Sequence, residues 1–279
     1  MIFNQPDLPA EFAESATLAS ESFHTFGSNF NLLSLLTGAV IGFPSFLSRF
    51  DAVSAITTTA PIIQIESVST ALLYAAALLL TGLLIGSLWL ALIVRYQEDE
   101  LDNWMAVLRR AGWIWLNAAL FLAALFITIL VVSAVLGIVL TMLALIAGPS
   151  ALTLVAIMQL FVFMIVIWIS IGLSLTVSAI ALDGVNVARA VWRSINVVGR
   201  NLSSTMGLLL IGLLLTEGFA RIWLLLSGSS WGIPLGILGT AYIGVALTAA
   251  TLLFYRGRYQ HWQQTRSAMI QARRQNHDE

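Results

Sequence analysis

The stretch WIWLNAALFLAALFITILVVSAVLGIVLTMLALIA, residues 113–147, decides the fold of this chain. It contains no Asp, Glu, Lys or Arg. About 20 apolar residues, at a rise of about 1.5 Å each, span a hydrocarbon core of roughly 30 Å. Backbone polar groups inside lipid must be paired within the segment, so such a run is helical. The stretch therefore predicts a transmembrane helix that is long enough to tilt or protrude.

The whole chain has the composition of a membrane protein. Hydrophobic residues make up 59% of its 279 residues, charged residues 10%, and its mean hydropathy is +0.91. A soluble domain carries far more charge on its surface. The absence of Cys excludes disulfides and thiolate metal sites, and the three His are scattered over the terminal segments, so we expect no metal and no cofactor. A net charge of −1 gives no indication of a nucleic-acid partner.

Apolar blocks separated by polar segments predict six spans in an all-α, polytopic membrane bundle. Their expected ranges are 30–48, 67–94, 113–147, 150–182, 203–227 and 235–255. The first is the weakest candidate, because Gly42 and Pro44 interrupt it. The apolar stretch 113–182 has room for two long or three short helices, and we divide it in two at the turn signal Gly148-Pro149.

The polar segment 184–200 predicts a helix at the membrane interface. Its polar residues are spaced 3, 4, 3 and 4 apart, which places them on one helix face: Asn186, Arg189, Arg193, Asn196 and Arg200. Apolar residues that include Trp192 and Ile195 fall elsewhere on the helix. An amphipathic helix of this kind lies in the plane of the membrane interface. Similar apolar stripes occur around Trp104 and Trp262.

The polar segments also indicate an internal repeat. Ala106, Val107, Arg109 and Asn117 have the same spacing as Ala190, Val191, Arg193 and Asn201, at an offset of 84 residues. A third, fainter copy lies near the N-terminus. We expect one membrane domain, 1–279, with pseudo-threefold repeat units at about 10–94, 98–182 and 184–255, each an interfacial helix followed by two spans. Residues 256–279 would form a basic cytoplasmic tail.

The repeat predicts the orientation of the chain. With two crossings per unit, eleven of the thirteen arginines fall on one side, and only Arg49 and Arg221 lie near the other. Arginine excess marks the cytoplasmic side. We therefore expect a multi-pass protein of the bacterial cytoplasmic (inner) membrane with both termini in the cytoplasm.

A few charged residues are candidate sites. Glu217 and Arg221, four residues apart in the fifth span, form a candidate intramembrane ion pair, for which structural pairing is favoured over a transport role. Asp183 is expected to cap the N-terminus of the interfacial helix. The acidic cluster at 98–102 lacks calcium-loop spacing. The candidate contacts to lipid headgroups are Arg109, Arg110, Arg189, Arg193 and Arg200.

The segment DGVNVARAVWRSINVVGRN, residues 183–201, resembles the recurring segment of the glycerophosphoryl diester phosphodiesterase membrane-domain-like families. The residues that carry the resemblance are Asp183, Gly184, Ala190, Arg193 and Ser194. It implies a six-helix membrane protein with amphipathic connectors. The catalytic barrel of that family, where present, is a separate soluble domain, so the resemblance implies no phosphodiesterase activity for this chain.

Together these features favour a non-enzymatic membrane protein. We expect a scaffold, an accessory subunit or a lipid-interacting helper, whose partners are membrane lipids and other membrane protein subunits, with no nucleic acid. The alternative is a transporter or permease-like protein for a small or amphiphilic solute. A polar cavity near the middle of the membrane would favour the transporter.

Overall fold

The computed structural model describes Leu35 and residues 67–98, 103–147, 151–226 and 231–278. The ordered elements over residues 67–278 of this part are helices. They are α3 (Val68–Gln97), α4 (Trp104–Ala147), α5 (Ala151–Leu173), α6 (Thr176–Asp183), α7 (Val187–Arg200), α8 (Leu202–Leu226) and α9 (Gly232–Asp278).

Five of these helices are long and apolar enough to cross a membrane: α3, α4, α5 with α6, α8 and α9. The chain is therefore an all-helical, multi-pass membrane protein. The block 113–182 contains two crossing segments, since α4 ends at Ala147 and α5 begins at Ala151. The predicted span 30–48 lies outside the described residues, as does most of the first repeat unit.

Two helices extend beyond the spans that we predicted for them. The polar stretch before Trp113 is not a separate helix, since α4 is continuous from Trp104 over 44 residues. The tail after Arg256 continues the last span, so α9 has 47 residues and an expected length of about 70 Å. No proline occurs after Pro234 to end α9, and its polar second half is rich in good helix formers.

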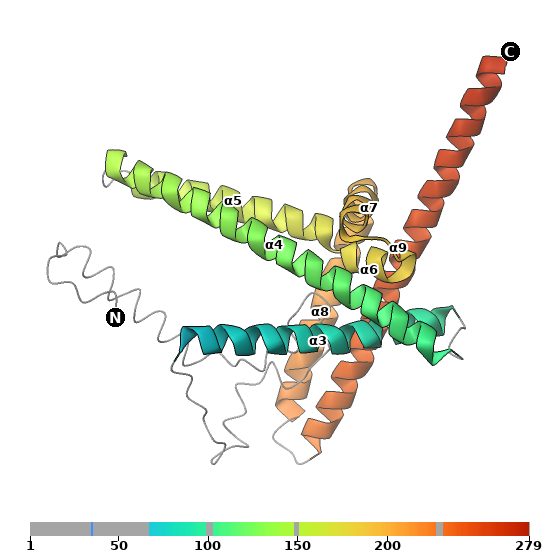
Figure 1. Ribbon diagram of the computed structural model, residues 1–279, viewed down its shortest axis with the longest axis horizontal. Coiled ribbons are helices and arrows are strands. Elements are labelled where there is room, and N and C mark those ends of the chain that lie inside the picture. Colours follow the sequence, from blue (N-terminus) through green and yellow to red (C-terminus); the bar gives the residue numbers. More distant parts are fainter. Residues whose placement is uncertain (1–34, 36–66, 99–102, 148–150, 227–230, 279) are drawn as a thin grey trace.

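The helices meet at one place, which we call the hub. It consists of α6, α7, the end of α3, the start of α4 and the middle of α9 (Figure 1). From it α3, the α4–α5 pair and the α8–α9 pair extend as three diverging arms. Most fully buried side chains lie in or beside the hub, among them Val94, Ile180, Ala190 and Tyr255.

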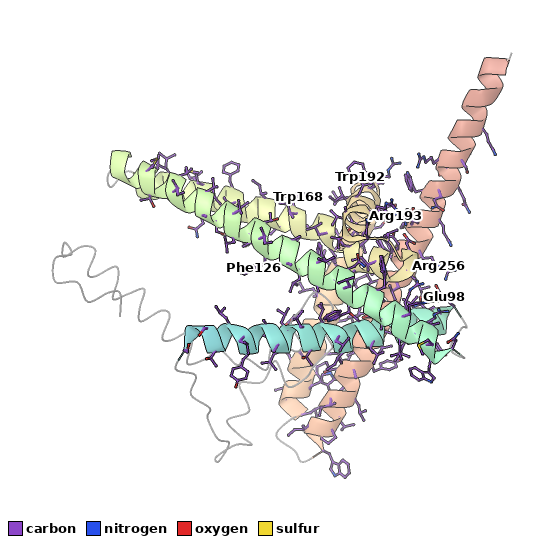
Figure 2. The ribbon with its side chains drawn as sticks, viewed as in Figure 1. Glu98, Phe126, Trp168, Trp192, Arg193 and Arg256 are labelled. Atoms are coloured by element: carbon purple, nitrogen blue, oxygen red, sulfur yellow. The ribbon has the colours of Figure 1, made fainter. Side chains whose placement is uncertain are left out.

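The arms pack through small residues and expose apolar ones. Gly82 and Gly86 are buried where α3 packs on α4, because small residues at this GxxxG spacing let two helices approach closely. Beside them, a hydrogen bond from Trp115 Nε1 to Leu80 O, 3.1 Å long, also joins the two helices. On the α4–α5 arm, Phe126 and Trp168 are exposed (Figure 2). Surfaces of this kind are suited to lipid.

Candidate functional site

The hub begins with a break between α5 and α6 that a serine of α7 stabilises. Ser194 is fully buried; its Oγ donates to Gly172 O at 2.6 Å and accepts from the Leu175 backbone N–H at 3.2 Å. The hydroxyl thus satisfies backbone groups that the interrupted helix leaves unpaired. Insertion of a side chain into the helical hydrogen-bond ladder is a recognised cause of such breaks.

Asp183 does not cap α7 as we predicted. It is the last residue of α6, and Gly184 follows with a left-handed φ of 60°, which only glycine adopts without strain. Asn186 caps α7 instead, because its Oδ1 accepts from the Arg189 backbone N–H at 3.2 Å. A carboxylate at a helix C-terminus is disfavoured by the helix dipole, so Asp183 needs donors from elsewhere.

Those donors come from α7 and α9 and form what we call the polar node: Asp183, Arg193, Tyr255 and Tyr259. Arg193 Nη1 donates to Asp183 Oδ2, and Tyr255 Oη donates to the same oxygen at 2.6 Å. The Arg193 guanidinium also lies 4.8 Å from the Tyr259 ring centroid, and the Tyr255 and Tyr259 rings stack at 5.6 Å. The node therefore joins three helices through one carboxylate.

The charge of Asp183 governs the ionisation of Arg193. Burial is the largest influence on the pKa of Arg193 and acts to lower it. The hydrogen bond and the charge of Asp183 outweigh burial and raise that pKa above its ordinary value. Arg193 is therefore ionised at every physiological pH.

Arg110 links α4 to the same corner. Its Nε donates to Ala181 O at 2.9 Å and its Nη2 to Leu182 O at 2.7 Å, so a cation caps the C-terminal carbonyls of α6. Its Nη2 lies 3.8 Å from Glu98 Oε1. The guanidinium groups of Arg110 and Arg193 thus both donate to intramolecular acceptors, and their predicted contact with lipid headgroups stays a prediction.

Other arginines of the hub remain exposed, and we call them the arginine face: Arg109, Arg189, Arg200, Arg258 and Arg266. None of these five has a carboxylate partner within the described part of the chain. The guanidinium groups of Arg200 and Arg266 both lie 5.6 Å from the centroid of Trp262. Three predicted headgroup residues, Arg109, Arg189 and Arg200, thus keep the exposure which that role requires.

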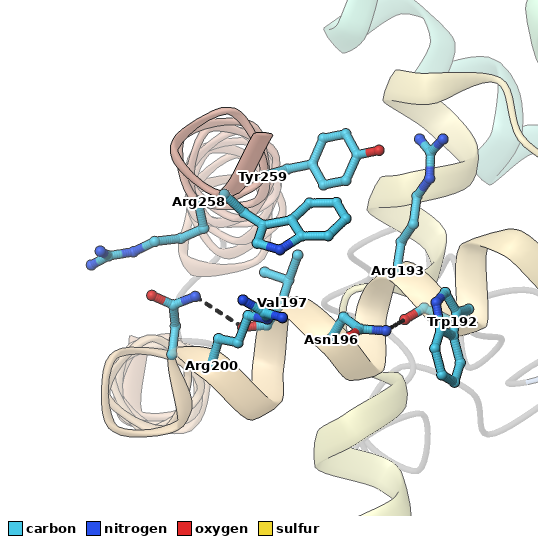
Figure 3. A pocket seen from close by; sticks show the side chains of 9 residues that line it. Trp192, Arg193, Asn196, Val197, Arg200, Arg258 and Tyr259 are labelled. Carbon is cyan, nitrogen blue, oxygen red and sulfur yellow. Dashed lines mark hydrogen bonds between the residues drawn. The ribbon is translucent and has the colours of Figure 1, made fainter. Parts of the chain in front are cut away.

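A shallow groove separates α7 from α9 on this face (Figure 3). Arg200 and Arg258 lie on its two sides, and Arg258 Nη2 donates to Ser204 Oγ at 3.3 Å. The groove encloses only about 30 Å³, so a headgroup could rest on its rim but not enter it. Trp192 and Ile195 of α7 are exposed beside it, with Trp192 exposed by 69%.

A larger polar cavity of about 360 Å³ lies on another side of Arg193 and Tyr259. Figure 2 labels three of its charged lining residues, Glu98, Arg193 and Arg256, at the hub. The lining residues are Glu98, Leu182, Asp183, Arg193, Arg256, Tyr259, Gln260 and Gln263. Of the acidic cluster predicted at 98–102, only Glu98 belongs to the described residues, and it contributes to this cavity.

The candidate ion pair lies well away from the hub. Glu217 and Arg221 are both exposed on α8, and Arg221 is roughly 28 Å from the start of the helix by its rise per residue. Their pairing stays a prediction. Sequence reasoning did not single out the hydroxyl of Tyr255, and it named Ser194 as part of the family resemblance, without a role for its hydroxyl. A serine inside an otherwise apolar buried helix face was the available signal for the second.

The residues that carry the family resemblance all have structural roles at the hub: Asp183 and Arg193 in the node, Gly184 in the turn, Ala190 in the core and Ser194 at the α5–α6 break. No protein-family model, curated protein or solved structure matches the chain. The resemblance therefore stays a prediction.

Proposed function

We propose that this protein is a non-enzymatic scaffold or lipid-interacting helper of the bacterial cytoplasmic membrane, whose arginine face binds anionic lipid headgroups. The observation that carries the proposal is the set of exposed arginines at the hub end of the apolar arms that have no carboxylate partner among the described residues. Arg200 and Arg266, whose guanidinium groups both lie against the Trp262 ring, repel each other less when an anion lies between them. Phosphate groups of lipids supply such anions at the membrane surface.

The geometry of α7 supports this role. Arg189 and Arg200 are exposed on one side of the helix, and Trp192 and Ile195 on another, while Ala190 and Ser194 are buried against the protein. Exposed Trp beside Arg suits a helix at headgroup depth, because an indole ring prefers that layer and a guanidinium group binds phosphate. Each arginine near an anionic surface contributes about 1 kcal/mol, which corresponds to about fivefold in affinity.

We also infer six crossings, a threefold repeat and cytoplasmic termini, with 30–48 as the first span. One observation supports the equivalence of two repeat units. Asn117 Nδ2 donates to Trp113 O at 3.0 Å, and Asn201 Nδ2 donates to Val197 O at 3.0 Å, so two residues at equal repeat positions make the same bond. The arginines at the hub end, against Arg221 near the far end of α8, favour a cytoplasmic hub. The family resemblance at 183–201 fits the same proposal.

Lipid titration of the purified protein tests the proposal. The wild type, delipidated in mild detergent, is titrated with phosphatidylglycerol or phosphatidylcholine, and bound lipids are counted by native mass spectrometry. We expect preference for phosphatidylglycerol in the wild type. Replacement of Arg189, Arg200, Arg258 and Arg266 together by Gln should reduce that preference at least tenfold, and replacement of the same four by Lys should preserve most of it. Equal retention of both lipids by the wild type would contradict the proposal.

Transport of a small solute is the second candidate function, favoured by the polar cavity beside Asp183. That cavity lies at the hub end of the arms and not near their middle. It could therefore form the entrance of a transport path, but not a substrate site in the middle of the membrane. Uptake of a solute by proteoliposomes, abolished by Asp183→Asn at unchanged protein yield, would place this function ahead of the scaffold.

A further inference from the structure

The polar cavity of the hub presents both signs of charge to the same small space. Glu98 enters it from the end of α3, and Arg256, Gln260 and Gln263 enter it from α9. Its volume of about 360 Å³ is within the lower range of small-molecule sites, which run from about 300 to 1,000 Å³. It can hold a compact polar molecule or a lipid headgroup, but not an acyl chain as well.

Four charged side chains of the described residues line the cavity, and two of them, Asp183 and Arg193, are paired with each other. Asp183 accepts from Arg193 and from Tyr255 Oη, so that carboxylate is neutralised within the protein. The side chains of the other two, Glu98 and Arg256, make no hydrogen bond within the described part of the chain. Arg256 is exposed and has no ion-pair partner in the described part of the chain. The Glu98 carboxylate forms a long ion pair with Arg110, whose Nη2 is 3.8 Å from Oε1 while its Nε and Nη2 donate to α6 carbonyls, so the Glu98 oxygens can still accept a hydrogen bond from a ligand.

The remaining polar groups complement both charges. The side chains of Gln260 and Gln263 each offer two N–H donors and one carbonyl acceptor to the cavity. A simple anion would meet the carboxylate of Glu98 as well as Arg256, and a simple cation would meet Arg256 as well as Glu98. A molecule with an ammonium group and an anionic group matches both at once.

We propose that the cavity lined by Glu98, Arg256, Gln260 and Gln263 binds a small zwitterion that carries a primary ammonium and a phosphate or carboxylate. Glu98 accepts from the ammonium, and Arg256 donates to the anionic group. Two sources present this chemistry: a soluble amino acid or aminoalkyl phosphate, and the headgroup of phosphatidylethanolamine. The site is separate from the arginine face, so the inference does not depend on the binding of anionic lipids.

Binding of O-phosphoethanolamine to the purified full-length protein, followed by isothermal titration calorimetry, tests the soluble arm. Ethanolamine alone and inorganic phosphate alone should bind at least tenfold more weakly, and glycine shows whether a carboxylate can replace the phosphate. Glu98→Gln and Arg256→Gln should each weaken binding at least fivefold. Gln263→Ala should weaken it too, whereas Gln264→Ala, on the neighbouring position outside the lining, should leave it unchanged. Thermal melts of every variant verify that it is folded.

The lipid arm uses nanodiscs made with phosphatidylethanolamine and phosphatidylglycerol, or with phosphatidylglycerol alone. Retention of phosphatidylethanolamine by the wild type and its loss from Glu98→Gln and Arg256→Gln, without binding of the soluble probe, would assign the site to the headgroup. Binding of the soluble probe alone would assign it to a free zwitterion. The proposal is overturned if inorganic phosphate binds as tightly as O-phosphoethanolamine, or if folded Glu98→Gln and Arg256→Gln variants lose neither ligand.

Discussion

Tyr255→Phe removes one hydroxyl from the polar node and leaves the rest of the side chain in place. The ring is fully buried and stacks on Tyr259, and both features survive the substitution. What is lost is the hydrogen bond from Oη to Asp183 Oδ2, 2.6 Å long. A hydrogen bond to a charged group contributes about 1.5–3 kcal/mol, so we expect the free energy of unfolding to fall by about that amount.

The matched control is Tyr259→Phe. Tyr259 belongs to the same stack, and its ring lies against Arg193, but its hydroxyl has no hydrogen-bond partner in the described part of the chain. We expect a loss below about 0.5 kcal/mol, as for a surface hydroxyl. Reversible unfolding in mixed micelles of detergent and dodecyl sulfate, followed by Trp fluorescence, gives both values.

A double-mutant cycle assigns the loss to the proposed bond. In Asp183→Asn the acceptor loses its charge, so adding Tyr255→Phe should cost less than it does in the wild type, with an interaction energy between about 0.5 and 3 kcal/mol. Equal losses for Tyr255→Phe and Tyr259→Phe, or strict additivity with Asp183→Asn, would refute the polar node as the junction between α6 and α9.

Three further substitutions test other parts of the account. Gly239→Ala should destabilise the α8–α9 arm by about 1–3 kcal/mol, because a Cβ there would lie 2.3 Å from Cζ2 of Trp223. The control is Gly207→Ala, which should be neutral or stabilising in the same unfolding assay, because a Cβ there has nothing within 4 Å. Arg110→Met should cost about 1.5–3 kcal/mol by exposing two unpaired carbonyls of α6, and a loss no larger than that of Arg109→Met would exclude this capping role. Glu217→Gln should lower the yield of folded protein more than it lowers lipid retention. A normal yield together with a loss of lipid retention or transport would favour a functional role of Glu217 over structural pairing.

The membrane-spanning elements could be predicted because they depend on composition alone. Long apolar runs and the turn signal at Gly148-Pro149 were sufficient for the division of 113–182, and the 3–4 spacing of Asn186, Arg189 and Arg193 was sufficient for α7. Helix ends were less predictable. Nothing in the local sequence at Trp113 or Arg256 forces a break, so α4 and α9 continue through changes in polarity.

The hub was not predictable, because its contacts join distant residues. Arg110 and the carbonyls of Ala181 and Leu182 are about 71 positions apart, and so are Asp183 and Tyr255. An arginine on an amphipathic stripe looks the same in sequence whether it faces lipid or a carboxylate. Only the packing of α6, α7 and α9 distinguishes Arg193, which is turned inward, from Arg189 and Arg200, which are exposed.

We propose that the arginine-rich hub of this multi-pass protein lies on the cytoplasmic side of the membrane. The chain contains no cysteine, so single cysteines can be introduced without a background. Ala188→Cys places a thiol on the exposed side of α7 at the hub, and Trp231→Cys places one at the start of α9, at the far end of its arm. We expect a membrane-impermeant maleimide to label Trp231→Cys in intact cells and Ala188→Cys only after permeabilisation. Labelling of both positions from the same side, or the reverse pattern, would contradict the account.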